Sequence, residues 1–163
     1  MHTPAARPAT RMTDAPFVPI NPRLLEFHTL WLAKCRDGKL PARADFLLDE
    51  LRPYIGRIAI LDVIDGGRDF RFRLYGTSIA EEYRGEMTGK SVSAFRANFY
   101  EAIVPGYRRA VATRAPHYDV PEIDDALMHY KWERLVVPLA SDGEGVDMIM
   151  VCSLELLYEQ RGS

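Results

Sequence analysis

The sequence has almost no excess of charge of either sign. Its 21 Lys and Arg residues are balanced by 23 Asp and Glu residues, which gives a formal net charge of −2 and a pI near 6.1. A protein that holds DNA or RNA through the phosphates needs a field of positive charge. We therefore expect no nucleic-acid partner.

Long apolar segments are also missing. No stretch approaches the roughly 20 apolar residues that a helix needs to cross a bilayer. The first residues contain Pro and Arg where a signal peptide has an apolar core. Both absences predict a cytoplasmic protein without a membrane partner.

Cysteine is scarce, with only Cys35 and Cys152 in 163 residues. The two lie far apart, form no CxxC motif and have no histidine at the spacing of a metal-ligand pair. We expect both to be buried, reduced thiols, with a disulfide as the less favoured alternative. The same spacing argument predicts no metal site.

The composition is that of an ordinary globular protein, with 47% hydrophobic and 27% charged residues. The length suits one domain of about 130 to 150 residues plus a tail. Five of the 11 prolines lie in the first 22 residues, among Ala, Thr and Arg. Such a segment buries too little apolar surface to offset the entropy of ordering it. We expect residues 1–21 to form a flexible Pro/Ala-rich tail.

Helical spacing marks residues 22–56 as an N-terminal helical cap. Gly38 is a natural end for the first helix. Asp45 is a suitable N-cap for a second, shorter helix that ends near Pro53. The inward positions of the first helix are Leu24, Leu25, His28, Trp31, Leu32 and Cys35.

Strand patterns begin the expected core domain, residues 57–159. Ile58 to Ile64 and Asp69 to Gly76 predict a hairpin around the turn Asp65-Gly66-Gly67. The second strand of this hairpin has two different faces. One face carries Phe70, Phe72 and Leu74, and the other carries Arg71, Arg73 and Tyr75.

Helices and then three more strands follow. A short helix starts near Gly76-Thr77, and Asn98 to Arg114 predicts a longer helix that Pro105-Gly106 should kink or interrupt. A turn at residues 142–145 joins the last two strands. The strands are Pro116 to Ile123, His129 to Leu139 and Val146 to Tyr158.

The last two strands are apolar on both faces. A sheet of this kind needs a cover on each side, so we expect the internal helices over one face and the N-terminal helix over the other. The register places Leu135, Val137, Leu139, Met148, Met150 and Cys152 on one face, and Trp132, Arg134, Val136, Ile149 and Val151 on the other.

The order of elements is similar to that of a PAS domain preceded by an N-terminal helical cap. Four segments within about residues 24–158 also resemble a family of small bacterial stand-alone PAS proteins. They are Trp31 to Phe46 with Arg36, Gly38, Pro41, Arg43 and Asp45; Asp69 to Thr77; Thr88 to Ser91; and Glu133 to Leu139 with Asp142-Gly143.

The resemblance implies an α+β fold, with helices on one face of a five-stranded antiparallel sheet and the N-terminal helical cap on the other. It also implies a small cavity that holds a sensory cofactor or metabolite, or is filled by side chains. Because this fold serves many roles, the function depends on the site.

We expect an apolar pocket with a few hydroxyl groups and with His117 as a polar group at its rim. A fully packed core is the open alternative. The candidate ligand-binding residues are Phe72, Leu74, Tyr83, Phe95, Phe99, Tyr107, His117, Leu135, Val137, Met150 and Cys152.

The sequence gives little support for a flavin, a haem or a phosphate-binding loop. Flavin photochemistry of the PAS type would need a reactive cysteine in an Asn-Cys-Arg setting on the helix after the hairpin, and Ser78 to Tyr83 contains none. Haem would need a histidine facing the cavity, and only His117 is reasonably placed. Gly85 to Ser91 is no P-loop, because Arg84 stands where the motif needs its first glycine. We expect an unidentified small apolar or amphipathic metabolite instead.

No pattern predicts an active site, since the adjacent acids Glu81-Glu82 and Asp124-Asp125 are typical of solvated charge. The expected function is a non-catalytic sensory module that binds a small ligand and acts on a signalling protein in trans. Two alternatives remain: a constitutive interaction scaffold with a filled core, and an α+β enzyme with His117 as general base.

The N-terminal helix and one sheet face offer an interface. Trp and Arg are frequent interface anchors, so a homodimer through this helix is expected. The same residues would otherwise form a stabilising cap within the chain. The candidate interface residues are Leu24, Phe27, Trp31, Arg73, Trp132 and Arg134.

Overall fold

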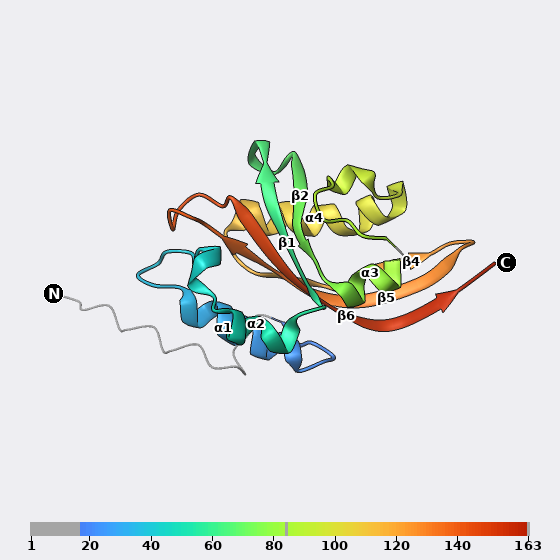
Figure 1. Ribbon diagram of the computed structural model, residues 1–163, viewed down its shortest axis with the longest axis horizontal. Helices are drawn as coiled ribbons and strands as arrows, with labels where there is room; N and C mark the ends of the chain where they lie inside the picture. The colour runs from blue at the N-terminus through green and yellow to red at the C-terminus, as the bar shows by residue number, and fades with distance from the viewer. Residues whose placement is uncertain (1–16, 84, 163) are drawn as a thin grey trace.

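A computed structural model describes residues 17–83 and 85–162 of the chain. They form an α+β fold in which helices lie on both faces of a six-stranded antiparallel sheet (Figure 1). The helices are α1 (Arg23–Lys34), α2 (Leu48–Leu51), α3 (Thr77–Tyr83) and α4 (Ala97–Thr113). The strands are β1 (Ile58–Ile64), β2 (Asp69–Tyr75), β3 (His117–Asp119), β4 (Glu122–Asp124), β5 (Met128–Leu139) and β6 (Met148–Gln160). Their order is β2-β1-β6-β5-β3, with β4 pairing with the start of β5.

Each face of the sheet has its own hydrophobic core. α4 covers one face, and α1 with the short α2 covers the other (Figure 1). The long strands β5 and β6 contribute alternate residues to the two cores, as predicted, because side chains alternate across a strand. Trp132, Val136, Ile149 and Val151 pack toward α4, whereas Leu135, Val137, Met150 and Cys152 pack toward α1.

The helix α1 forms where the apolar spacing predicts it. Leu24, Phe27 and Trp31 are buried against the sheet. The indole Nε1 of Trp31 donates a 2.9 Å hydrogen bond to the carbonyl oxygen of Pro138 in β5. This bond satisfies the one polar atom of a buried ring, so Trp31 takes the role of a cap within its own chain.

Two elements differ from the prediction. The expected third strand is divided into β3 and β4, which gives six strands instead of five. Pro121 lies at the division and has no N–H to donate to a strand ladder. The expected second helix is also shorter: α2 begins at Leu48, and the Asp45 carboxylate accepts a hydrogen bond from the Ala42 N–H instead of capping it.

The end of the expected tail is packed onto the domain. Phe17 stacks on Tyr118 of β3, with 5.0 Å between ring centroids, and meets His28 of α1 edge-on. The backbone N–H groups of Ile20 and Asn21 donate to the Glu133 carboxylate at 2.8 and 2.6 Å. The prediction of a flexible tail is therefore wrong for residues 17–21, because the buried Glu133 needs these donors. Residues 1–16 lie outside the described part of the chain.

This contact of the N-terminal segment predicts unequal effects for two neighbouring truncations. Phe17→Ala removes the stacked ring and should lower the free energy of unfolding by about 1 kcal/mol. Val18→Ala is the matched control, because Val18 is 90% exposed and should change it by under about 0.5 kcal/mol. Urea denaturation of both variants measures the difference, and equal losses would contradict the packed position of Phe17.

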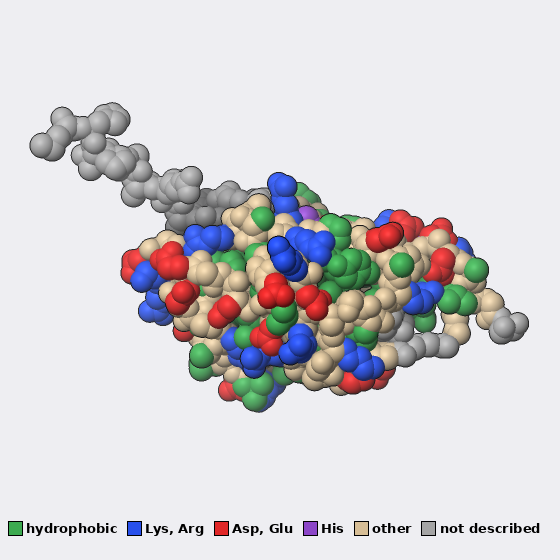
Figure 2. Space-filling view, turned by 90° about the horizontal axis from the view of Figure 1, so that it is seen from above, with side chains coloured by type: hydrophobic (Ala, Val, Ile, Leu, Met, Phe, Trp, Pro, Cys, Tyr) green, Lys and Arg blue, Asp and Glu red, His purple; other side chains and the backbone are tan. Residues whose placement is uncertain are grey.

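The surface carries both signs of charge. On the face shown in Figure 2, Lys and Arg side chains are interspersed with Asp and Glu side chains. Among the described residues, no helix combines the length and the apolar character needed to span a membrane.

Candidate functional site

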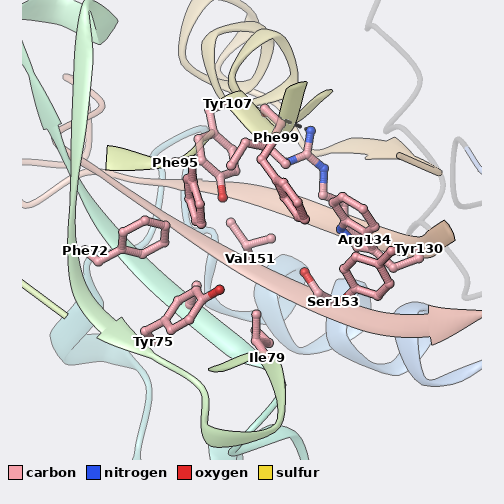
Figure 3. A pocket seen from close by; sticks show the side chains of 13 residues that line it. Phe72, Tyr75, Ile79, Phe95, Phe99, Tyr107, Tyr130, Arg134, Val151 and Ser153 are labelled. Atoms are coloured by element: carbon pink, nitrogen blue, oxygen red, sulfur yellow. Dashed lines mark hydrogen bonds between the residues drawn. The ribbon is translucent and has the colours of Figure 1, made fainter. Parts of the chain in front are cut away.

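A pocket lies between α4 and the sheet (Figure 3). Its cavity volume is about 40 Å³, and the whole space between its walls, including the side open to solvent, is about 460 Å³. Four strands, α3 and α4 contribute to its walls. The lining residues are Ala59, Phe72, Tyr75, Ile79, Phe95, Phe99, Ile103, Tyr107, Tyr130, Trp132, Arg134, Val151 and Ser153.

Flat aromatic rings form most of the pocket wall. Tyr130 and Trp132, two residues apart on one face of β5, stack with 4.4 Å between ring centroids. Phe99 of α4 lies nearly parallel to Trp132 at 6.2 Å and to Phe95 at 6.0 Å. Phe72 of β2 meets Phe95 edge-on. Stacked and edge-on pairs of this kind hold the rings in fixed positions, so the wall is both apolar and rigid.

Among the described lining residues, the one charged group is the guanidinium of Arg134, which lies on the α4 side in Figure 3. The Arg134 residue is only 1% exposed. Its Nε donates to Oδ1 of Asp119 at 2.6 Å, and its Nη2 donates to Oδ2 of Asp119 at 3.0 Å. Nη2 also donates to the carbonyl oxygen of Ile103 at 2.9 Å. The third nitrogen, Nη1, is buried and has no hydrogen-bond partner among the described residues.

Asp119 of β3 is held ionised by this pair. Burial alone would raise the pKa of its carboxyl group, but the hydrogen bonds and charge of Arg134, with a smaller contribution from His117, outweigh burial and lower that pKa below its ordinary value. His117 lies beside Asp119, with Nε2 and Oδ2 separated by 3.1 Å. The guanidinium and the carboxylate therefore form a neutral pair at neutral pH.

Gly106 lets α4 lie close to this ion pair. A Cβ atom added there would stand 2.4 Å from Nη2 of Arg134, 2.9 Å from Cδ2 of His117 and 3.1 Å from Oδ2 of Asp119. Pro105 and Gly106 both lie inside α4, at positions where neither residue favours a helix. Their helical cost is offset by the close approach of the helix to Arg134.

Tyr107 lies next to the guanidinium, with 5.0 Å between Cζ of Arg134 and the centroid of the Tyr107 ring. Burial raises the pKa of the Tyr107 hydroxyl, and the guanidinium of Arg134 opposes part of that shift through its charge and its approach to the hydroxyl. The hydroxyl is nevertheless not placed to form a hydrogen bond with Nη1, which has no partner among the described residues. The hydroxyl is therefore protonated at neutral pH and is a hydrogen-bond donor.

The structure places four of the candidate pocket residues, Phe72, Phe95, Phe99 and Tyr107, in the pocket lining. Four others belong to the opposite core. Leu135, Val137, Met150 and Cys152 pack against α1, so their assignment to the pocket is wrong. The predicted register separated the two faces correctly, but both faces are apolar and the pattern did not distinguish the face under α4.

Leu74 was assigned to the pocket by simple alternation, and it is instead 40% exposed. A β-bulge between Ile60 and Leu61 shifts the pairing of β1 with β2. An extra residue in one strand exchanges the faces beyond it, so Tyr75 takes the pocket position.

The two remaining candidates are His117 and Tyr83. His117 is half-buried and interacts with Asp119, one step away from the pocket wall. The side chain of Tyr83 lies outside the described part of the chain.

The candidate interface residues are mostly inside the protein. Leu24, Phe27 and Trp31 are buried in the core against α1. Trp132 and Arg134 line the pocket on the other face, so they do not contact α1 and their assignment to an interface is wrong. Arg73 is exposed and pairs with Asp62, with Nε and Oδ1 2.6 Å apart. An apolar strand surface and an interface have the same composition, which explains the error.

Several lining residues were not predicted from the sequence. For Tyr130 and Ser153 the strand spacing could have predicted a position in the pocket. Each lies two residues from a residue predicted to face the helices, Trp132 or Val151. The partner of Arg134 was also missed, because Asp119 meets it only when β3 pairs with β5. The separation of Asp119 and Arg134 in the sequence does not predict their contact.

The pairing of β4 with β5 brings together Glu122, Asp124 and His129. One ligand atom from each lies within 4.8 Å of the others. Nε2 of His129 lies 2.6 Å from Oε1 of Glu122, and Asp124 forms an ion pair with Arg161. The two carboxylates are exposed and already have protein partners, which is typical of surface charge.

Both cysteines are free thiols, as predicted, and Cys152 is fully buried, but the prediction of burial is wrong for Cys35, which is half-buried. Burial raises the pKa of Cys35 to about 11 and that of Cys152 to about 12. Because the thiolate is the reactive form, and the higher intrinsic nucleophilicity of a thiolate with a raised pKa offsets only part of its scarcity, we expect the folded protein at pH 8 to react with a disulfide reagent at least about tenfold more slowly than a free thiol. Cys35 should react first, and a Cys35→Ser variant should react only as fast as the fold opens. Rapid labelling of Cys152 in that variant would contradict its burial.

No family model matches the chain, and no curated protein matches it. The function therefore has to be argued from the geometry of the pocket.

Proposed function

We propose that this chain is a non-catalytic sensory module of the PAS type. It binds a small ligand between α4 and the sheet and acts in the cytoplasm on a signalling protein in trans. The observation that carries the proposal is an aromatic pocket containing a buried guanidinium nitrogen that has no partner among the residues that the structure describes. Buried polar groups in proteins are nearly always hydrogen-bonded, so a missing partner at a pocket points to a ligand.

The PAS assignment has support from the arrangement of the elements. Two helices precede a hairpin, short helices, a longer helix and the C-terminal strands. The sheet is antiparallel, and the pocket lies between it and the helices that follow the hairpin. This is the position at which the resemblance places a sensory cavity.

The absence of catalysis has support from the chemistry of the wall. The thirteen described residues that line the pocket include no carboxylate, histidine or cysteine. Asp119, the nearest acid in this network, already accepts two hydrogen bonds from Arg134 and has a lowered pKa. A carboxylate held in this way is a poor general base.

Signalling in trans requires that the ligand favour one packing of the helices on the sheet. A ligand shifts such an equilibrium only by its difference in affinity for the two states. Because the inward side of α1 is buried in its own chain, a homodimer or a partner would use other side chains of the N-terminal region. Leu47, Leu48 and Ile55 are apolar and exposed there.

Native mass spectrometry of protein purified gently from its own cells tests the proposal. A reproducible extra mass that is released on denaturation is the expected result. Val151→Trp, which fills the pocket, should abolish the extra mass, whereas Val137→Trp should retain it. Both substitutions overpack a buried position, at a cost of about 1–3 kcal/mol, so the second controls for stability. A bare mass for the unmodified protein would overturn the ligand-binding function.

The second candidate is a constitutive interaction scaffold with a filled core. The small cavity volume of about 40 Å³ favours it, because one water molecule needs about 10–15 Å³ of such cavity volume, so the cavity holds only a few waters. For a scaffold of this kind, native mass spectrometry gives a bare mass, and ligand-free protein retains all binding to its partner.

A further inference from the structure

Arg134 Nη1 defines what the pocket recognises. Of the three guanidinium nitrogens, Nε and Nη2 are directed to Asp119 and Ile103, and Nη1 is left buried without a partner among the described residues. A guanidinium nitrogen only donates hydrogen bonds. The missing partner is therefore an acceptor, such as a carbonyl or carboxylate oxygen.

The charge balance of the site separates these two acceptors. Asp119 already neutralises Arg134 through two parallel hydrogen bonds. A carboxylate ligand would add a second negative charge to a buried site that holds one positive charge, and an uncompensated buried charge is costly. A neutral carbonyl oxygen accepts the same charge-assisted bond without changing the balance.

The shape of the pocket selects a flat molecule. Flat rings line the pocket: the pairs Tyr130–Trp132, Trp132–Phe99 and Phe99–Phe95 are each within about 22° of parallel, and Phe99 is tilted by 38° to Tyr130. The cavity volume of about 40 Å³ accommodates one small polar group, so a ring has to lie toward the side that is open to solvent, within the space of about 460 Å³ between the walls. Stacking of a planar ligand on fixed rings adds affinity beyond area burial.

We propose that the pocket binds an uncharged, planar carbonyl compound whose oxygen accepts a hydrogen bond from Arg134 Nη1. The inference rests on the proposed ligand-binding function and names the chemical class of the ligand. The ring of the ligand lies against Trp132 and Phe99, and the Arg134–Asp119 pair stays intact.

Three single-ring probes test it: benzamide, benzoate and toluene. Benzamide is neutral with a carbonyl, benzoate is charged, and toluene has no acceptor. The readout is the NMR signal of the Trp132 indole N–H at pH 7. The Trp31 indole is an internal control, because it is bonded to Pro138 on the other face of the sheet. Benzamide should shift the Trp132 signal alone, and bind about tenfold more tightly than benzoate or toluene.

Two matched substitutions locate the interaction. Arg134→Lys keeps a positive charge for Asp119 but removes Nη1, so it should reduce benzamide binding about tenfold to the level of toluene. Arg73→Lys makes the same change at an exposed ion pair and should leave all three affinities unchanged.

The outcomes distinguish a failure of the neutral-carbonyl inference from a failure of the proposed ligand-binding function. Equal binding of benzamide and toluene to the unmodified protein overturns the neutral-carbonyl class while leaving a working pocket. Preferential binding of benzoate overturns it in favour of an acidic ligand. No shift of the Trp132 signal with any probe overturns the proposed ligand-binding function itself. These results need only the unmodified protein, so they hold even if Arg134→Lys fails to fold.

Discussion

Replacing Arg134 with methionine should lower the free energy of unfolding by about 3 kcal/mol. The substitution keeps a long side chain but removes the partner of Asp119 and the donor to the Ile103 carbonyl. Removing one member of a buried ion pair costs about 3–5 kcal/mol, because the other charge is left without a partner. The lower end applies because the Asp119 side chain is 30% exposed and regains some hydration. Urea denaturation followed by circular dichroism at pH 7 measures the loss.

A double-mutant cycle with Asp119→Asn is the control for this prediction. The variant with both substitutions should be more stable than Arg134→Met alone, because neither charge is then buried without a partner. Losses that simply add would show that the two side chains do not stabilise each other, in contradiction to the observed geometry.

The same pair should have a signature in the dependence of stability on pH. Arg134 and His117 hold the pKa of Asp119 below its ordinary value. A carboxyl group with a lowered folded-state pKa stabilises the fold above its unfolded-state pKa of about 3.9. That stabilisation is lost as the pH falls through the folded-state pKa. The unmodified protein should therefore lose more stability than the double variant on acidification below about pH 4.

Much of the architecture follows from the sequence, because it depends on local periodicity. The α1 spacing of Leu24, Phe27 and Trp31 and the period-two pattern of β5 and β6 each have one structural reading. The bounds of β1 agree with the apolar run Ile58–Ile64. The assignment of these residues to opposite faces of the sheet therefore needs no knowledge of tertiary contacts.

The location of the pocket does not follow from that periodicity. Both faces of β5 and β6 are apolar, and only the covering helix distinguishes them. The β-bulge after Ile60 places Tyr75 instead of Leu74 on the pocket face of β2. No residue type in that segment predicts a bulge. The sequence could predict which residues share a face, but not which face encloses a cavity.

The sequence of α4 contains a glycine that indicates a close contact of this helix. Pro105-Gly106 predicts a kink or an interruption, and the interruption is wrong, because both residues lie inside one helix. Glycine in a helix costs about 1 kcal/mol relative to alanine, so its presence there calls for a close neighbour. The neighbour is the Arg134–Asp119 pair with His117.

Gly106→Ala should therefore destabilise the protein by about 2 kcal/mol, although alanine is the better helix former by about 1 kcal/mol. The new Cβ would stand 2.4 Å from Nη2 of Arg134 and 2.9 Å from Cδ2 of His117. The end of an arginine side chain usually moves aside at little cost. Here the movement would break the hydrogen bonds from Nη2 to Asp119 and to the Ile103 carbonyl.

Gly145→Ala is the matched control, because the nearest atoms to its added Cβ lie 4.0 Å away, and it should be nearly neutral. Thermal and urea denaturation of both variants measure the contrast, and the Trp132 indole N–H signal reports on the pocket. If Gly106→Ala stabilises the protein and leaves that signal in place, α4 does not approach Arg134 as closely as described. If it destabilises the protein and moves the signal, the same glycine that permits the ion pair also shapes the pocket beside it.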